Sequence, residues 1–264
     1  MKKLFSVVCA LWAMLAAPGA HAGGISDTGV NAYWGGDGHG FGDVIGGSTY
    51  DINGATITRV GSILTVTIAT NFAGHAGIAP SAAPGGIGYG DVFLSQVWNP
   101  FGSDAHHSND NAANGTKWTY GLSLNNRLSN SGGTFKLYQL NGATNASNIL
   151  NSDSFITCGS SCTYRNGQAV AVKTSSSTVT NTGLTGNWTV TANQQIQFNI
   201  NVASTDLINF SSFAMHWGET CQNDVIEGIT SVVPLPGSMP LIAIGLGAML
   251  VLRRRQTGGV ALPA

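Results

Sequence analysis

Apolar and polar residues alternate along much of the chain between residues 55 and 217, and this period of two is typical of strands with one buried face. The clearest case runs from Leu64 to Ile68, where leucine, valine and isoleucine alternate with threonines. Because Gly61-Ser62 precedes it, this segment and residues 56–60 are predicted to form a hairpin. The same alternation recurs at residues 118–124, 135–140, 196–202 and 213–217.

Roughly ten such segments, with turn residues about every 8–12 positions and no long helical period, predict an all-β fold. We expect a single antiparallel β-sandwich or jelly-roll-like domain over residues 23–232. Residues 73–90 are predicted to form a long loop, residues 205–210 one helical turn, and residues 229–237 a short stalk that leaves the domain.

The chain begins with the three parts of a secretory signal peptide. Lys2 and Lys3 precede an apolar run from Leu4 to Ala17, and Ala20-His21-Ala22 forms a small-residue cleavage site. Residues 1–22 are therefore predicted to be removed on export, so that the mature chain begins at Gly23.

The other end of the chain carries a second membrane signal. Val233-Pro234-Leu235-Pro236-Gly237 precedes an apolar segment at about 239–252, which is followed by Arg253, Arg254 and Arg255. Because three guanidinium groups would halt export, we expect a transmembrane helix with the domain outside and a cytoplasmic tail at 256–264. At about 1.5 Å per residue, this helix is shorter than a hydrocarbon core of about 30 Å, which suits a tether that is recognised and then processed.

This order of motif, apolar segment and basic triplet resembles the PEP-CTERM sorting signal of bacterial exosortase substrates, in a variant with Leu235 in place of the usual Glu. Two blocks of the domain, residues 88–94 and 215–228, also resemble segments of exosortase-dependent surface proteins. The resemblance implies residues 233–255 as the sorting signal and an exosortase-like membrane protease as partner. It also implies display at the surface or in the extracellular matrix of a bacterium, and it implies no catalytic residue. A single-pass anchor without processing is the alternative.

Composition excludes one class of partner. Between residues 23 and 232 there are six lysines and arginines and twelve aspartates and glutamates, a net charge of −6, because five of the 11 basic residues lie in the terminal signals. Nucleic acid is therefore not expected as a partner, since phosphate binding needs a basic face. Serine, threonine and asparagine supply the polarity instead, which suits a neutral polysaccharide or a divalent cation.

Three cysteines follow the signal peptide. Cys158 and Cys162 are separated by Gly-Ser-Ser, which allows a tight turn, and they are predicted to form a local disulfide in an oxidising compartment. Cys221 is then expected to be a buried thiol. Pairing of Cys221 with either of the others is the alternative.

No strong metal motif is present, and no cofactor is expected. His106 and His107 are adjacent in a polar loop, a poor arrangement for binding one ion together. The same loop offers Asp104, Asn109 and Asp110 as weak calcium ligands, because their spacing is not that of an EF-hand.

Catalytic signals are weak as well, since the nucleophile motif Gly-x-Ser-x-Gly is missing from the sequence. Glu219, Asp224 and Glu227 are the candidates for the paired carboxylates of a glycosidase. They precede the predicted stalk, so we interpret them as loop carboxylates that accept backbone hydrogen bonds. His216, between Met215 and Trp217, is predicted to face away from both as a structural histidine.

These observations favour an exported, surface-displayed, non-enzymatic β-protein associated with envelope or exopolysaccharide. The second hypothesis is a carbohydrate-binding module, calcium-assisted or not. Tyr33, Trp34 and Trp98 are its candidates for stacking on sugar rings, although core packing accounts for most tryptophans equally well. A glycan-active hydrolase is the third and weakest hypothesis.

Overall fold

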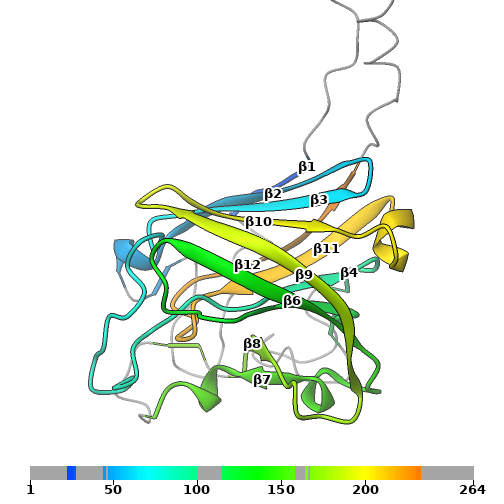
Figure 1. Ribbon diagram of the computed structural model, residues 1–264. Helices are drawn as coiled ribbons and strands as arrows, with labels where there is room; N and C mark the ends of the chain where they lie inside the picture. The colour runs from blue at the N-terminus through cyan, green and yellow to red at the C-terminus, as the bar shows by residue number, and fades with distance from the viewer. Residues whose placement is uncertain are drawn as a thin grey trace, which may run out of the picture. The chain divides into compact units, whose positions relative to one another are not determined.

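The computed structural model describes residues 23–27, 44–45, 47–99, 115–157, 164–165 and 167–232. Within these residues the chain forms an all-β domain with twelve strands and four short 3-10 helices (Figure 1). Ten strands make one antiparallel sheet, in the order β1-β2-β3-β10-β9-β6-β5-β4-β11-β12. The other two, β7 and β8, pair with each other.

The bounds of the strands are β1 (Gly23–Ile25), β2 (Ile52–Val60), β3 (Ile63–Thr70), β4 (Val92–Ser95), β5 (Tyr120–Leu124), β6 (Gly132–Leu140), β7 (Ile149–Asn151), β8 (Ala169–Val172), β9 (Val179–Thr191), β10 (Gln195–Asn201), β11 (Ser212–Gly218) and β12 (Val225–Ser231). The short helices are η2 (Ser48–Tyr50), η3 (Asn145–Ser147), η4 (Ser152–Ser154) and η5 (Asp206–Asn209).

The two ends of the ten-stranded sheet meet, so that the sheet is nearly closed into a barrel-like shape. β1 lies beside β12, and Gly23 packs so closely against Thr230 and Ser231 that a Cβ atom would overlap the Thr230 hydroxyl. The predicted antiparallel all-β fold is confirmed. The predicted sandwich of two sheets is not what the structure has. Alternation records only that one face of a strand is buried, and a sheet curled on itself buries that face as a second sheet would.

The inner face of the curved sheet encloses the main hydrophobic core. Leu64, Val66 and Ile68 of β3 are buried there, as their alternation predicts, together with Trp188 of β9 and Phe198 of β10. The Trp188 and Phe198 rings stack with centroids 6.3 Å apart. Full burial of side chains of this size stabilises the fold by about 1.5–3 kcal/mol each.

A second, smaller core lies on the opposite face of β4, β5 and β11, where β7 and β8 cover the sheet. Phe93 of β4 and Ala214 of β11 pack there against Ile149 of β7 and Val172 of β8, with Trp118 beside them. As a result β4 is buried along its whole length, and β11 along nearly all of it. We call β4, β5, β11, β7 and β8 the covered half of the domain.

Segments outside the main strands partly match the predictions. The η5 helix confirms the helical turn, and residues 71–91 form the predicted long loop, in which Ile78 and Ile87 make an isolated bridge. The predicted stalk is wrong at its start. Residues 229–231 belong to β12, which pairs with β11 from Val225 to Ser231. The sequence conceals this strand because Glu227 and Gly228 interrupt its apolar pattern.

Among the residues that the structure describes, no helix is long and apolar enough to cross a membrane. The predicted signal peptide at 1–22, the predicted transmembrane segment at 239–252 and the predicted tail at 256–264 lie outside those residues.

Candidate binding face

The strands β2, β3, β10 and β9 bury only one face. Burial alternates along β3, β10, residues 55–60 of β2 and residues 186–191 of β9, so every second side chain there points to solvent. We call the polar part of this surface the open face; it consists of Thr56, Thr58, Thr65, Thr67, Asn187, Thr189, Thr191, Gln195, Gln197 and Asn199. In these four described strands, no outward-facing residue is charged.

Strand register aligns the neutral side chains of the open face in rows. Thr56 of β2 lies opposite Thr67 of β3, and Thr67 lies opposite Gln197 of β10. Gln197 in turn lies opposite Thr189 of β9. A second row, two residues along each strand, consists of Thr58, Thr65, Asn199 and Asn187. Because neighbouring strands are about 4.8 Å apart, adjacent members of a row can contact each other and one common ligand.

Side-chain hydrogen bonds join the two rows. The Thr65 hydroxyl donates to Asn199 Oδ1 at 2.7 Å. The Asn199 amide donates to Gln197 Oε1 at 3.3 Å, and the Gln197 amide donates to the Thr67 hydroxyl at 3.3 Å. These contacts restrict rotamers before any ligand arrives, which lowers the entropy lost on binding.

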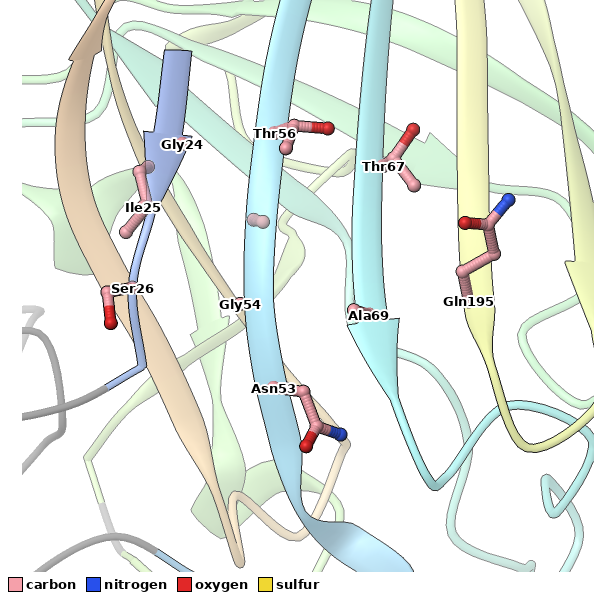
Figure 2. Close-up of a pocket in the computed structure, with 10 residues that line it drawn as sticks. Gly24, Ile25, Ser26, Asn53, Gly54, Thr56, Thr67, Ala69 and Gln195 are labelled. Atoms are coloured by element: carbon pink, nitrogen blue, oxygen red, sulfur yellow. The ribbon is translucent and has the colours of Figure 1, made fainter. Parts of the chain in front are cut away.

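The surface is hollowed where the open face meets β1 (Figure 2). Gly24, Gly54 and Ala69 line this groove with little or no side chain, and its volume is about 580 Å³. Gly54 lies at a β-bulge with φ of 134°, a conformation that favours glycine, and a Cβ there would approach the Ile25 carbonyl oxygen to 3.1 Å.

Polar side chains surround the small residues of the groove. Figure 2 shows Thr56, Thr67 and Gln195 on the neighbouring strands β2, β3 and β10, with Asn53 near the start of β2 and Ser26 just after β1. All five offer neutral donors and acceptors. The groove therefore continues the chemistry of the open face into a concave surface.

The three carboxylates proposed for a glycosidase do not form an open pair. Glu219 and Asp224 are fully buried, whereas Glu227 is partly buried. Asp224 accepts hydrogen bonds from the backbone N–H groups of Ile52 at 2.7 Å and Val225 at 2.9 Å. For Asp224 the prediction of a carboxylate that supports the backbone is confirmed.

Glu219 differs from that prediction, because neither of its carboxyl oxygens has a hydrogen-bond partner among the described residues. Burial raises the pKa of Glu219 well above its usual range, and the neighbouring Asp224 raises it further. The Arg165 guanidinium and the nearby N–H groups of Glu219 and Asp224 lower this pKa and offset only part of the rise. Burial therefore disfavours the charged form of this carboxyl, which has no access to solvent.

Glu227 binds side chains instead of backbone. Its Oε2 lies 3.1 Å from His216 Nδ1, and its Oε1 accepts a hydrogen bond from Trp98 Nε1 at 2.9 Å. His216 Nε2 lies 2.9 Å from the Ala169 carbonyl oxygen, which can only accept, so Nε2 carries a hydrogen. A second proton must then lie between Nδ1 and Glu227.

The same geometry confirms His216 as a structural histidine. It is fully buried with both ring nitrogens bonded, and it faces the second core, whereas Met215 and Trp217 face the main core. Trp98 is partly buried against the second core, and its indole N–H is held by Glu227. Core packing therefore accounts for Trp98 better than stacking on a sugar.

Cys221 is a buried free cysteine, as predicted. Burial raises the pKa of its thiol well above the usual range, and Glu219 adds to the rise. In the described part of the chain, no group of three or more His, Cys, Asp or Glu side chains could hold a metal ion.

The other predicted site residues lie outside the described residues. They are the sorting motif Val233, Pro234, Leu235, Pro236 and Gly237, the basic residues Arg253, Arg254 and Arg255, the cysteines Cys158 and Cys162, the loop residues Asp104, His106, His107, Asn109 and Asp110, and the aromatics Tyr33 and Trp34. The disulfide, the calcium ligands and the sorting signal stay predictions.

Sequence reasoning missed the open face, although a signal for it exists. Thr-x-Thr occurs at 56–58, 65–67 and 189–191, and Gln-x-Asn occurs at 197–199. Each triplet places two neutral hydrogen-bonding side chains on one side of a strand. Their alignment depends on which strands pair, and β3 pairs with β10 across more than a hundred residues of sequence.

No protein-family model, curated protein or solved structure matches the chain. Its function is therefore inferred from its own residues.

Proposed function

We propose that the protein is exported and displayed at a bacterial cell surface as a non-enzymatic β-domain associated with envelope or exopolysaccharide. An exosortase-like membrane protease sorts it through residues 233–255. The two terminal signals in the sequence support the export and the tether.

The observation that carries the association with polysaccharide is the open face. Hydroxyl and amide groups without a net charge cover one side of four strands. Such groups match the hydroxyl-rich surface of a glycan, and they leave no buried charge unpaired when a neutral polymer covers them. A surface of this kind suits a protein that lies within a polysaccharide matrix.

The chemistry of the groove supports a binding role over a catalytic one. Among the described residues that line it, asparagine, threonine, serine and glutamine supply the polar groups, and none has a carboxylate, histidine, lysine or cysteine side chain. These described side chains include no group that usually transfers a proton or activates a hydroxyl nucleophile. The three candidate carboxylates lie elsewhere, buried or bonded.

Deletion of residues 233–264 tests the sorting part of this proposal. We expect the truncated protein to be released, folded, into the periplasm or the medium, whereas the full chain fractionates with the envelope. Replacing Arg253, Arg254 and Arg255 by serine should weaken retention, because the stop to export is then lost. Intact mass of protein recovered from cells would show whether residues 1–22 and the tail are removed. A truncated protein that stays membrane-bound, or a full chain found in the cytoplasm, would contradict the proposal.

Association with polysaccharide is tested on intact cells. The surface protein should co-purify with the extracellular matrix and should be released when the matrix glycans are digested by added glycosidases. Release by high salt alone would indicate an electrostatic attachment to another component and would count against the proposal.

A further inference from the structure

We propose that the open face and the groove form one continuous site for a neutral, extended polysaccharide chain. The site runs across β2, β3, β10 and β9 along the row Thr56, Thr67, Gln197 and Thr189. This inference names the ligand class for the proposed function and rests on it for the biological setting. The binding step itself is carried by the geometry of the described residues.

Charge selects the ligand class. The domain carries a net charge of −6 between residues 23 and 232, yet none of that charge lies on the outward positions of these four strands. An anionic polymer would meet no cation on the open face and would be repelled by the domain as a whole. A cationic polymer would find no carboxylate there. Charged residues lie only at the border of the face in the described residues: Lys136 of β6 is opposite Thr185, and Asp51 precedes β2.

The extent of the site selects a polymer over a small sugar. Four strands span three intervals of about 4.8 Å, or roughly 14 Å, so a ligand that covers the row must be several sugar units long. No aromatic ring is among the outward residues of these described strands, so the strands themselves offer no ring for stacking. Each neutral hydrogen bond between the ligand and a water-exposed group adds little to the binding free energy. A long polymer that makes many such contacts at once therefore binds most tightly.

The same surface is poorly suited to a protein partner. Protein interfaces have an apolar centre surrounded by polar residues. On β2 and β3 the exposed large hydrophobic residues are Val60 and Ile63, which pair with each other at the hairpin tip. The middle of the open face is polar throughout, and its side chains are already held by hydrogen bonds between Thr65, Asn199 and Gln197.

The test uses the full-length protein in a neutral detergent and measures co-sedimentation with two neutral probes, swollen cellulose and dextran beads, and with one anionic probe, alginate beads. We expect binding to at least one neutral probe, unchanged between low salt and 1 M NaCl because no charge is involved. Binding to alginate should be absent. Glucose at concentrations that saturate ordinary sugar sites should compete poorly, whereas soluble dextran or cello-oligosaccharides should compete well.

Two variants and a matched control locate the site. Thr56→Lys and Thr189→Lys place a charge at opposite ends of the row, on residues that are exposed and therefore tolerate the change. Each should reduce retention on the neutral probe at least fivefold. Ser175→Lys adds the same charge at an exposed position in the turn between β8 and β9 and should change nothing.

Several outcomes would overturn the inference. Equal binding by the wild type and both lysine variants would show that the open face is not the site. Loss with Thr56→Lys alone would confine binding to the groove, and binding to alginate alone would assign the wrong ligand class. In each case surface display and release by glycosidases could still hold, so failure here differs from failure of the proposed function.

Discussion

The two halves of the sheet are built from similar strands but differ in what lies over their outer face. In the covered half, β7 and β8 lie over β4, β5 and β11, so that Phe93, Ala214 and His216 are buried on the face opposite the main core. In the open half, the corresponding face of β2, β3, β10 and β9 meets solvent with threonine, asparagine and glutamine. One sheet thus has a half whose outer face is covered and a half whose outer face meets solvent.

The ionisable side chains with the least exposure among the described residues lie in or next to the covered half. Asp91, Arg165, Glu219 and Asp224 are all less than 2% exposed. Asp91 accepts a hydrogen bond from Leu124 of β5, whereas Asp224 accepts one from Ile52 of β2. The two blocks at 88–94 and 215–228 meet here, since β4 pairs with β11 and Tyr89 bridges to Glu219. The residues that prompted the proposed resemblance therefore lie in the covered half and not on the open face. In this domain they hold strands together, since they pair β4 with β11.

Asp91 should show the largest effect of a single substitution. Its carboxylate accepts hydrogen bonds from the N–H groups of Leu124 at 3.0 Å and Val172 at 2.8 Å, and it pairs with Arg127 at 3.3 Å. Asp91→Ala leaves two buried donors unpaired and should lower the free energy of unfolding by about 3–5 kcal/mol. Urea unfolding of the full chain measures this. Asp91→Asn keeps one acceptor and should lose less; equal losses would show that the charge, not the hydrogen bonds, matters.

Glu219 should make stability depend on pH. Its pKa is raised in the folded state, so its contribution is fully present below the ordinary carboxyl pKa of about 4.3 and is lost as pH rises toward the folded value. Glu219→Gln removes the titration and should therefore stabilise the protein at pH 8 by the order of 1–3 kcal/mol, with almost no difference at pH 4. Unfolding of both proteins at the two pH values decides this, and a difference that does not change with pH would contradict it.

Much of the fold could be predicted from the sequence, for a local reason. Burial of one strand face leaves a period of two, which located β3, β10 and β11, and Gly61-Ser62 located the hairpin between β2 and β3. Closure of the sheet could not be predicted, because it depends on β1 meeting β12 across the whole domain. Strand β12 was missed, since both of its faces carry small or polar residues such as Glu227 and Gly228.

The candidate site was less predictable. Ionisable residues such as His216, Glu219 and Glu227 are natural candidates for a site in a sequence. The fold nevertheless buries the first two fully and the third partly. Threonine and glutamine in a strand give no such indication of a site, because any solvent-facing strand contains them. Only the pairing of β3 with β10, and the absence of a layer over them in the described residues, turns them into a surface.

We expect the thiol of Cys221 to be unreactive in the folded protein because it is buried. It is 2% exposed, and its raised pKa leaves almost no thiolate, which is the reactive form. We expect iodoacetamide to label Cys221 at neutral pH only after unfolding. Peptide mapping without reduction should also show Cys158 linked to Cys162. A peptide that links Cys221 to either of them would contradict both statements.

The substitution Cys221→Ser tests the burial of this side chain through the free energy of unfolding. The hydroxyl needs a stronger hydrogen bond than the thiol in the same buried space, so the change should cost about 1–2 kcal/mol. Cys221→Ala is the matched control, because it removes the polar atom and loses only packing. If serine proves as stable as the wild type, water or an unassigned partner reaches this position.

Thr189 should show the smallest effect on stability and the sharpest contrast between the halves. Its side chain is exposed, no buried group depends on it, and exposed substitutions change the free energy of unfolding by about 0.5 kcal/mol or less. Thr189→Lys should therefore unfold at the same urea concentration as the wild type while losing retention on a neutral polysaccharide. Asp91→Asn should have the opposite effects. It should unfold at a lower urea concentration, and under conditions where it is folded its retention on the polysaccharide should equal that of the wild type. If Thr189→Lys instead destabilised the protein as much as Asp91→Asn, the side chains of the open face would contribute to the stability of the fold. Cross-strand pairing alone would then explain its neutral rows.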